Sequence, residues 1–116
     1  AGGDLIDLSG LYELADNDPT FIRDMLQLFV RKTPELLQSL DAEIGVGNHT
    51  VIKALSHKMK ASYNSIGCTQ GGQLLATIEE LAANIESPDL LIPRVEELSK
   101  LSDEVLSALT EKINAE

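Results

Sequence analysis

The feature of this sequence that most constrains its fold is the spacing of its apolar residues. Leu, Ile, Val, Met and Phe recur three or four residues apart along most of the chain, and no stretch alternates polar and apolar residues. This spacing matches the turn of an α-helix and places the apolar residues on one face, whereas a half-buried β-strand needs alternation. The pattern therefore predicts an all-α fold in which amphipathic helices share one core.

Capping residues divide the first part of the chain into two helices. A short helix is expected within residues 5–14, beginning near Asp7 or Ser9. Asp18 is a good N-cap for the next helix, and Pro19 suits the first helical position, where a missing N–H costs nothing. The sequence therefore predicts a helix that starts at Pro19.

A long apolar stripe follows from Phe21 to Ile44 and contains Pro34. Pro34 could begin a new helix or kink a single long one. We favour the kink, because the apolar stripe continues on both sides of the proline. Residues 45–48, Gly-Val-Gly-Asn, are expected to end this helix, since glycine is preferred just beyond a helix C-terminus.

Two more helices are expected in the middle of the chain. The third should run from about residue 50 to Ser65 and stop at Gly67. Gly71 and Gly72 indicate either a loop or a weak first turn of the fourth helix. The fourth helix is expected to carry six apolar residues: Leu74, Leu75, Ile78, Leu81, Ala82 and Ile85.

Two prolines precede the apolar stripe of the last helix. Ser87 and Pro88 form a cap-plus-proline signal, and Pro93 is expected to open the main part of the helix. Because the loops are short, the chain is predicted to form an antiparallel up-down four-helix bundle with a short extra N-terminal helix. Residues 1–116 suffice for one domain, with residues 1–4 interpreted as a linker or cloning remnant.

The charge balance argues against several kinds of partner. Nine basic residues face nineteen acidic ones, for a net charge of −10, which disfavours binding to nucleic acid or to an acidic membrane surface. No apolar run approaches the length of about 18 residues that a membrane-spanning helix needs. Cys68 is the single cysteine, so we expect a small buried residue without a disulfide, in a cytoplasmic protein.

The predicted third helix displays a histidine. On a wheel of about 100° per residue, its apolar residues centre about 20° from Leu55, and His57 lies at about 200°, directly opposite. The side of His57 also carries two lysines and two uncharged residues: Lys53, Lys60, Ala61 and Asn64. Ala61 is small enough to let a partner approach the imidazole closely, although alanine is also simply a good helix former.

Three interpretations of His57 compete: an ordinary solvated histidine, a buried structural one, and an exposed nucleophile. The wheel argues against burial, and an unperturbed imidazole titrates near about 6.5, so one nitrogen is free at neutral pH. Lys53, Lys58 and Lys60 lie within about one turn, and no Asp or Glu occurs between residues 43 and 79. These cations could be a solvated basic face, or they could bind a phosphoryl group, which a neighbouring carboxylate would repel.

These residues carry a resemblance to a known family. His57-Lys58-Met59-Lys60-Ala61-Ser62, followed by Gly67 and then by Leu74, Ile78 and Glu79, resembles the signature of the histidine-containing phosphotransfer (HPt) domains of bacterial two-component phosphorelays. The segment from Phe29 to Leu37 resembles the second helix of that family, so the resemblance covers nearly the whole chain. Two positions depart from the pattern: Ala61 replaces the usual glycine, and Gly71 replaces an apolar residue, which puts the start of the fourth helix in doubt.

The resemblance implies a role for each residue around His57. His57 would be the phosphorylated residue, Lys60 would hold the phosphoryl oxygens, and Glu79 would lie nearby on the adjoining helix. Lys53, one turn earlier, is expected to support the phosphoryl group as well. The surface expected to meet the partner contains three further residues: Lys58, Ala61 and Asn64.

The implied function is to accept a phosphoryl group from the aspartate of a response-regulator receiver domain and to pass it to another receiver. A hybrid sensor histidine kinase is a second candidate partner. The receiver would supply Mg²⁺, so the domain is expected to need no cofactor or metal of its own. No Gly-rich phosphate-binding loop with a following Lys-Ser/Thr occurs, so the chain is expected to be a carrier and not a kinase. Met25, Phe29 and Tyr63 are candidates for an exposed apolar contact surface.

Two alternatives stay open from the sequence. The first is a helical adaptor, a degenerate HPt domain that binds a partner without phosphotransfer. The second is a small enzyme with His57 as general base, which would need a concave pocket and a partner carboxylate. The relay hypothesis itself depends on an imidazole that projects into water among lysines. An imidazole packed in the core, or capped by an acidic neighbour, would contradict it.

Overall fold

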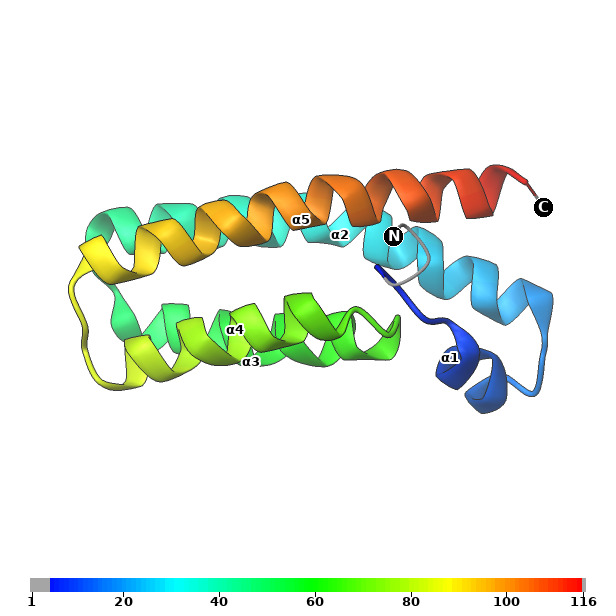
Figure 1. The fold of residues 1–116 in the computed structure, drawn as a ribbon, viewed down its shortest axis with the longest axis horizontal. Coiled ribbons are helices and arrows are strands. Elements are labelled where there is room, and N and C mark those ends of the chain that lie inside the picture. The colour runs from blue at the N-terminus through cyan, green and yellow to red at the C-terminus, as the bar shows by residue number, and fades with distance from the viewer. Residues whose placement is uncertain (1–4, 116) are drawn as a thin grey trace.

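Five helices and no strand make up residues 5–115, which are the part of the chain that the computed structural model describes. The helices are α1 (Ser9–Leu14), α2 (Pro19–Val46), α3 (His49–Ser65), α4 (Thr69–Ala83) and α5 (Pro88–Asn114). The four long helices alternate in direction, with α2 beside α5 and α3 beside α4 (Figure 1). The all-α prediction with a short first helix is confirmed, and the predicted linker, residues 1–4, lies outside the described residues.

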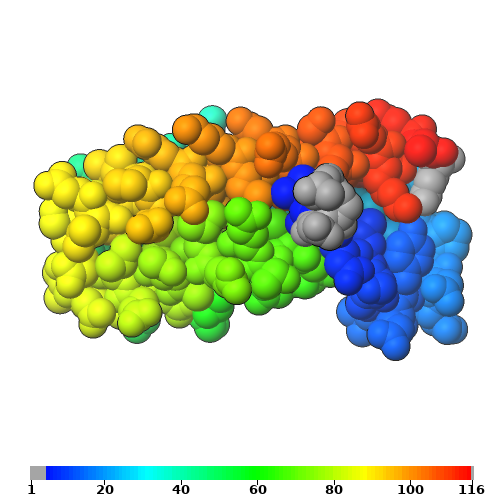
Figure 2. Space-filling model, viewed as in Figure 1, coloured from blue at the N-terminus to red at the C-terminus, as the bar shows by residue number. Residues whose placement is uncertain are grey.

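The bundle is a rod of 43 × 23 × 23 Å. In Figure 2, α1 packs at one end of the rod and the α4–α5 loop lies at the opposite end. Within the described residues, no helix combines the length and the apolarity needed to cross a membrane.

The ends of α2 follow the capping signals in the sequence. The Asp18 carboxylate accepts a hydrogen bond from the Thr20 N–H at 3.0 Å, and the helix begins at Pro19 as predicted. It continues unbroken through the exposed Pro34, so the interpretation of one long helix is confirmed. It ends where Gly47 adopts a left-handed conformation with φ of 72°.

The end of α4 differs from the prediction. We expected Ile85 on its apolar face, but α4 ends at Ala83 and the Ile85 side chain is 74% exposed. The chain turns out of the helix there: the Glu86 N–H bonds to the Leu81 carbonyl at 3.0 Å, and Ile85 takes the left-handed conformation with φ of 55°. This is the same closing turn that Gly47 makes at the end of α2, with isoleucine in the glycine position.

The last helix begins earlier than the sequence indicated. The Ser87 hydroxyl accepts a hydrogen bond from the Asp89 N–H at 3.2 Å, and α5 starts at Pro88. The prediction that Pro93 opens the main part of the helix is wrong, because Pro93 lies inside α5. Pro93 can only deprive the Asp89 carbonyl of its helical partner, and Asp89 is exposed, so that carbonyl can bond to water instead.

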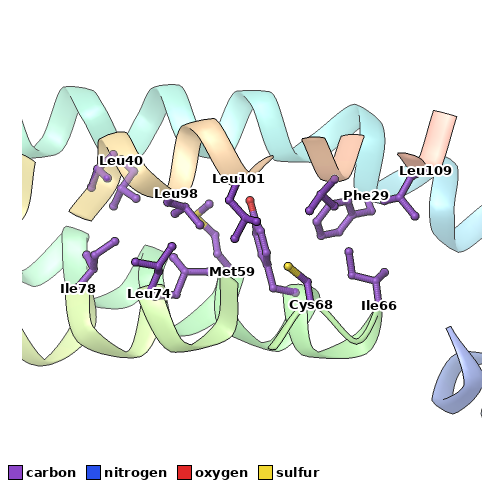
Figure 3. Close-up of a cluster of buried hydrophobic side chains, with 14 of the residues drawn as sticks. Phe29, Leu40, Met59, Ile66, Cys68, Leu74, Ile78, Leu98, Leu101 and Leu109 are labelled. Carbon is purple, nitrogen blue, oxygen red and sulfur yellow. The ribbon is translucent and has the colours of Figure 1, made fainter. Parts of the chain in front are cut away.

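The core runs along the axis of the bundle, where apolar side chains of α2 to α5 meet (Figure 3), and Leu11 of α1 extends it. Tyr63 of α3 lies at its centre: it is fully buried, its hydroxyl is 2.5 Å from the Ser102 hydroxyl of α5, and its ring meets the Phe29 ring edge-on at 5.2 Å. Phe29 and Tyr63 are therefore not exposed contact residues, and that part of the prediction is wrong. The wheel had assigned no direction to either ring, whereas the packing of α2 against α3 turns both inward. Cys68 is buried and free, as predicted.

The doubt about the start of α4 is resolved in favour of a helical turn. The helix begins at Thr69, so Gly71 and Gly72 belong to its first turn and not to a loop, and both are buried against α3. Glycine has a low helix propensity, but here the absence of a side chain lets two helices approach closely. Gly67 precedes this helix with φ of 70°, which ends α3 as predicted.

Candidate functional site

His57 lies in the middle of α3, on the flank that faces α4. The fully buried residues of α3 are Ile52, Ser56, Met59 and Tyr63. On the wheel they centre about 70° from Leu55, so His57 is about 130° from the buried direction and not directly opposite it. The helix is therefore rotated by about 50° from the orientation that the sequence predicted. Leu55, predicted to face the core, is only half-buried, and Ser62 is exposed.

The imidazole of His57 is 72% exposed, which excludes the interpretation of a buried structural histidine. Its Nδ1 atom lies 3.1 Å from Oε2 of Glu79, which projects from α4. None of the side-chain hydrogen bonds within residues 5–115 involves the other ring nitrogen, Nε2. The ring is therefore held from one nitrogen and open to solvent at the other.

Glu79 connects His57 to Lys60. Its Oε1 atom accepts a hydrogen bond from the Lys60 ammonium at 2.8 Å, and its side chain is only 20% exposed. The bond from Lys60 lowers the pKa of Glu79 below its ordinary value, the bond from His57 adds to this effect, and partial burial opposes it. Glu79 is therefore an ionised carboxylate at neutral pH, shared by an ammonium group and an imidazole.

The relay hypothesis was made conditional on an imidazole without an acidic neighbour, and Glu79 is such a neighbour. Glu79 is 22 residues away in sequence, but the antiparallel packing of α3 on α4 brings it into contact. The position that the family resemblance implied for Glu79 is the one that the structure shows. The condition that we set from the sequence was too broad, because a carboxylate on Nδ1 has a different effect from one at the reacting nitrogen. A carboxylate at Nδ1 leaves Nε2 open, and the charge of this one is offset by Lys60.

The three lysines near His57 differ in whether they form an ion pair. Lys60 is bound to Glu79, whereas Lys53 and Lys58 are exposed and make no ion pair within residues 5–115. Ala61 and Asn64 are exposed too, as predicted. The Asn64 amide, however, folds over Gly72 of α4, so part of it faces the neighbouring helix and not a partner.

A groove of about 400 Å³ lies between α1, α2 and α3. Its floor is mostly apolar and includes the exposed side chains of Met25 and Leu28. Lys58 lines it, but His57 does not. Met25 was a predicted contact residue, whereas Leu28 was missed because the sequence pattern alone does not show which apolar residues of α2 stay exposed. Within residues 5–115, no group of three His, Cys, Asp or Glu side chains is placed to hold a metal ion.

The structure is thus a bundle of antiparallel helices with an exposed, carboxylate-bound imidazole on one flank. The family model described as Hpt domain matches residues 24–113, which run from the second turn of α2 almost to the end of α5 and include all three residues of the His57 site. The chain therefore belongs to the Hpt domain family, and the resemblance in its sequence is confirmed. Searches of curated proteins and of solved structures gave no match.

Membership of this family gives the chain its general role. Hpt domains are phosphotransfer modules of two-component signalling, they carry a phosphoryl group and are not kinases, and they interact with receiver domains and kinases.

Proposed function

We propose that this domain carries a phosphoryl group on Nε2 of His57, accepting it from the aspartyl phosphate of one receiver domain and passing it to another. The observation that carries the proposal is the contact of Glu79 with Nδ1 at 3.1 Å, which leaves Nε2 exposed. A carboxylate can only accept, so Nδ1 carries the hydrogen and the neutral ring keeps its lone pair on Nε2. Carboxylates orient histidines in this way in metal and protease sites.

The transfer step needs no movement of a proton. The lone pair on Nε2 forms the N–P bond while the P–O bond to the receiver aspartate breaks, and the electron pair of that bond stays on the aspartate oxygen. The Nδ1–H remains in place, so the phosphorylated ring is a cation beside the Glu79 carboxylate. The reverse step returns the same neutral ring with the same hydrogen, which suits a carrier that loads and unloads.

The charges around Nε2 support this chemistry. A phosphoryl group on Nε2 would bring negative charge to a surface that holds three lysines in an otherwise acidic domain. Lys53 and Lys60 are proposed to neutralise its oxygens. The receiver is proposed to supply Mg²⁺ and its own acidic pocket, because in phosphoryl transfer the metal bridges and neutralises phosphate oxygens.

The groove between α1, α2 and α3 is the proposed docking surface for the receiver. It is mostly apolar and is lined by Lys58, whose side chain leaves α3 about 100° round the helix from that of His57. Exposed Met25 and Leu28 provide apolar contact area, and Lys58 provides a charge at the edge. A receiver held there can present its active site to the exposed imidazole, and Ala61 does not obstruct the approach.

The alternative of a general-base enzyme needs a carboxylate beside His57. The sequence did not show one close in the chain, but Glu79 contacts the imidazole in the structure. A histidine oriented by a carboxylate is the arrangement of a hydrolase base. However, His57 does not line the groove, whereas a general base must lie inside the concave site that holds its substrate. The degenerate adaptor would need neither Glu79 nor Lys60 at the imidazole, and their presence favours the carrier.

Transfer from a receiver tests the proposal. The domain is incubated with a receiver that carries labelled phosphate, and we expect the label on the wild-type protein and not on His57→Gln. The matched control is His49→Gln, which removes the other histidine of α3, whose ring lies between the backbone carbonyls of Gly47 and Glu86. The control should take up label normally. Label on His57→Gln would show that His57 is the wrong residue, and binding of the receiver without any labelling of the wild type would favour the adaptor.

A further inference from the structure

The contact between Glu79 and His57 belongs to a regular register of α3 against α4. Asn64 of α3 lies against Gly72 of α4. Seven residues back along α3 is His57, and seven residues forward along α4 is Glu79. Seven residues are about two turns of an α-helix, so both contacts belong to one antiparallel alignment. The spacing of the helices at the glycine end therefore bears on the geometry at the imidazole end.

Gly71 determines how closely α4 can approach at that end. A Cβ atom on Gly71 would overlap Cδ2 of Tyr63, and would lie 3.0 Å from its Cε2 and 3.1 Å from Sγ of Cys68. Tyr63 cannot move aside, because it is fully buried, bonded through its hydroxyl to Ser102 and packed against Phe29. Any side chain at position 71 would therefore have to push the two helices apart.

Gly72 offers a contrast. A Cβ atom there would meet the Asn64 side chain, with its Oδ1 atom nearest. Asn64 is exposed, so its amide can rotate away into solvent. Alanine should therefore be tolerated at position 72 and not at position 71.

We propose that Gly71, through its fit against Tyr63, is a positioning residue for His57: it sets the α3–α4 distance at which the Glu79 carboxylate reaches both Nδ1 of His57 and the Lys60 ammonium. The inference rests on the proposed role of His57 as phosphoryl carrier. It also accounts for the departure of Gly71 from the family pattern, in which an apolar residue is expected. In this chain the large side chain, Tyr63, is on α3, and the residue without a side chain, Gly71, is on α4.

The experiment compares Gly71→Ala with Gly72→Ala in the whole domain. Both changes add one methyl group and raise helix propensity equally. We expect Gly71→Ala to lose the ¹⁵N NMR signature of an Nδ1-protonated, carboxylate-bound His57 and to slow transfer from a phosphorylated receiver by about tenfold or more, as loss of a histidine-orienting partner does. Gly72→Ala should match the wild type in both measurements.

A size exchange provides the second variant. Tyr63→Ala combined with Gly71→Leu places the large side chain on α4 and the gap on α3, and should restore the His57 signature. Gly71→Ala with a wild-type signature and transfer rate would overturn the proposal. So would an exchange variant that folds without the signature, because a spacing set by one large and one small residue should survive their exchange.

The NMR signature requires no phosphoryl group, which separates the two claims. If the wild type shows the signature but takes no label from any receiver, the proposed function fails and the positioning role stands. If transfer is normal but Gly71→Ala leaves the signature intact, the proposed function stands and the positioning role fails.

Discussion

Replacing Ile85 should reverse the usual order of alanine and glycine. Inside a helix, alanine is the more stabilising of the two by about 1 kcal/mol. Ile85 instead has φ of 55°, where an L-residue pays about 1–2 kcal/mol and glycine pays nothing. We therefore expect Ile85→Gly to be more stable than Ile85→Ala, although both remove the same 74% exposed side chain.

The magnitude follows from two opposing terms. Relief of the left-handed strain favours glycine by about 1–2 kcal/mol, and the greater freedom of glycine in the unfolded chain opposes this by about 0.5–1 kcal/mol. The net advantage of glycine over alanine at position 85 should be about 1 kcal/mol. For a domain of this size, that difference corresponds to about 4–6 °C in Tm.

Gly47, in the same closing turn at the C-terminal end of α2, provides the matched comparison. It has φ of 72°, and no atom lies within 4 Å of the place where a Cβ would stand, so Gly47→Ala measures the backbone strain alone. It should cost about 1 kcal/mol. Urea titrations of the four proteins give each midpoint, with the slope checked for constancy. An alanine variant at position 85 that equals or exceeds the glycine variant would refute the reasoning.

Two further predictions concern the site. Because the pKa of Glu79 is lowered in the folded domain, its ionised form contributes stability above its ordinary pKa, and this contribution is lost as pH falls through the lower folded-state pKa. The stability gap between wild type and Glu79→Gln should therefore be widest near pH 7 and close on acidification, as urea midpoints at several pH values would show; a constant gap would contradict this. Leu28→Ser and Lys58→Glu should each weaken receiver docking and slow transfer by about tenfold at low receiver concentration, with the His57 NMR signature unchanged. The same Leu→Ser change at Leu14, which is exposed outside the groove, should leave transfer unaltered and serves as the control.

Local signals in the sequence predicted the helices well. Asp18 with Pro19, Gly47 and Gly67 each act within a few residues of themselves, and each begins or ends a helix where the sequence indicated. The exposure of His57 was predictable for a similar reason, since a wheel needs only the residues of one helix.

Contacts between helices were harder to predict. The sequence pattern of α3 alone does not show how the helix is rotated against its neighbours, so the buried direction was misplaced by about 50°. The same limitation explains the errors at Phe29 and Tyr63. The residues alone showed no carboxylate close to His57 in the chain, and only the family resemblance placed Glu79 at the site. Pro93 was misassigned because a helix can continue through a proline where the carbonyl left without a partner is exposed to water. Ile85 was misassigned because the spacing of apolar residues does not show the left-handed turn that ends α4.

The ring of Tyr63 has a consequence for how this sequence can change over time. It belongs to α3 and touches α2 through Phe29, α4 through Gly71 and α5 through Ser102, so one side chain meets every other long helix. A change in volume or polarity at Tyr63 leaves its three partners mismatched, and a change at any one partner alters its fit against Tyr63. Descendants of this chain should therefore alter the four positions together, so that substitutions in helices far apart along the sequence become correlated.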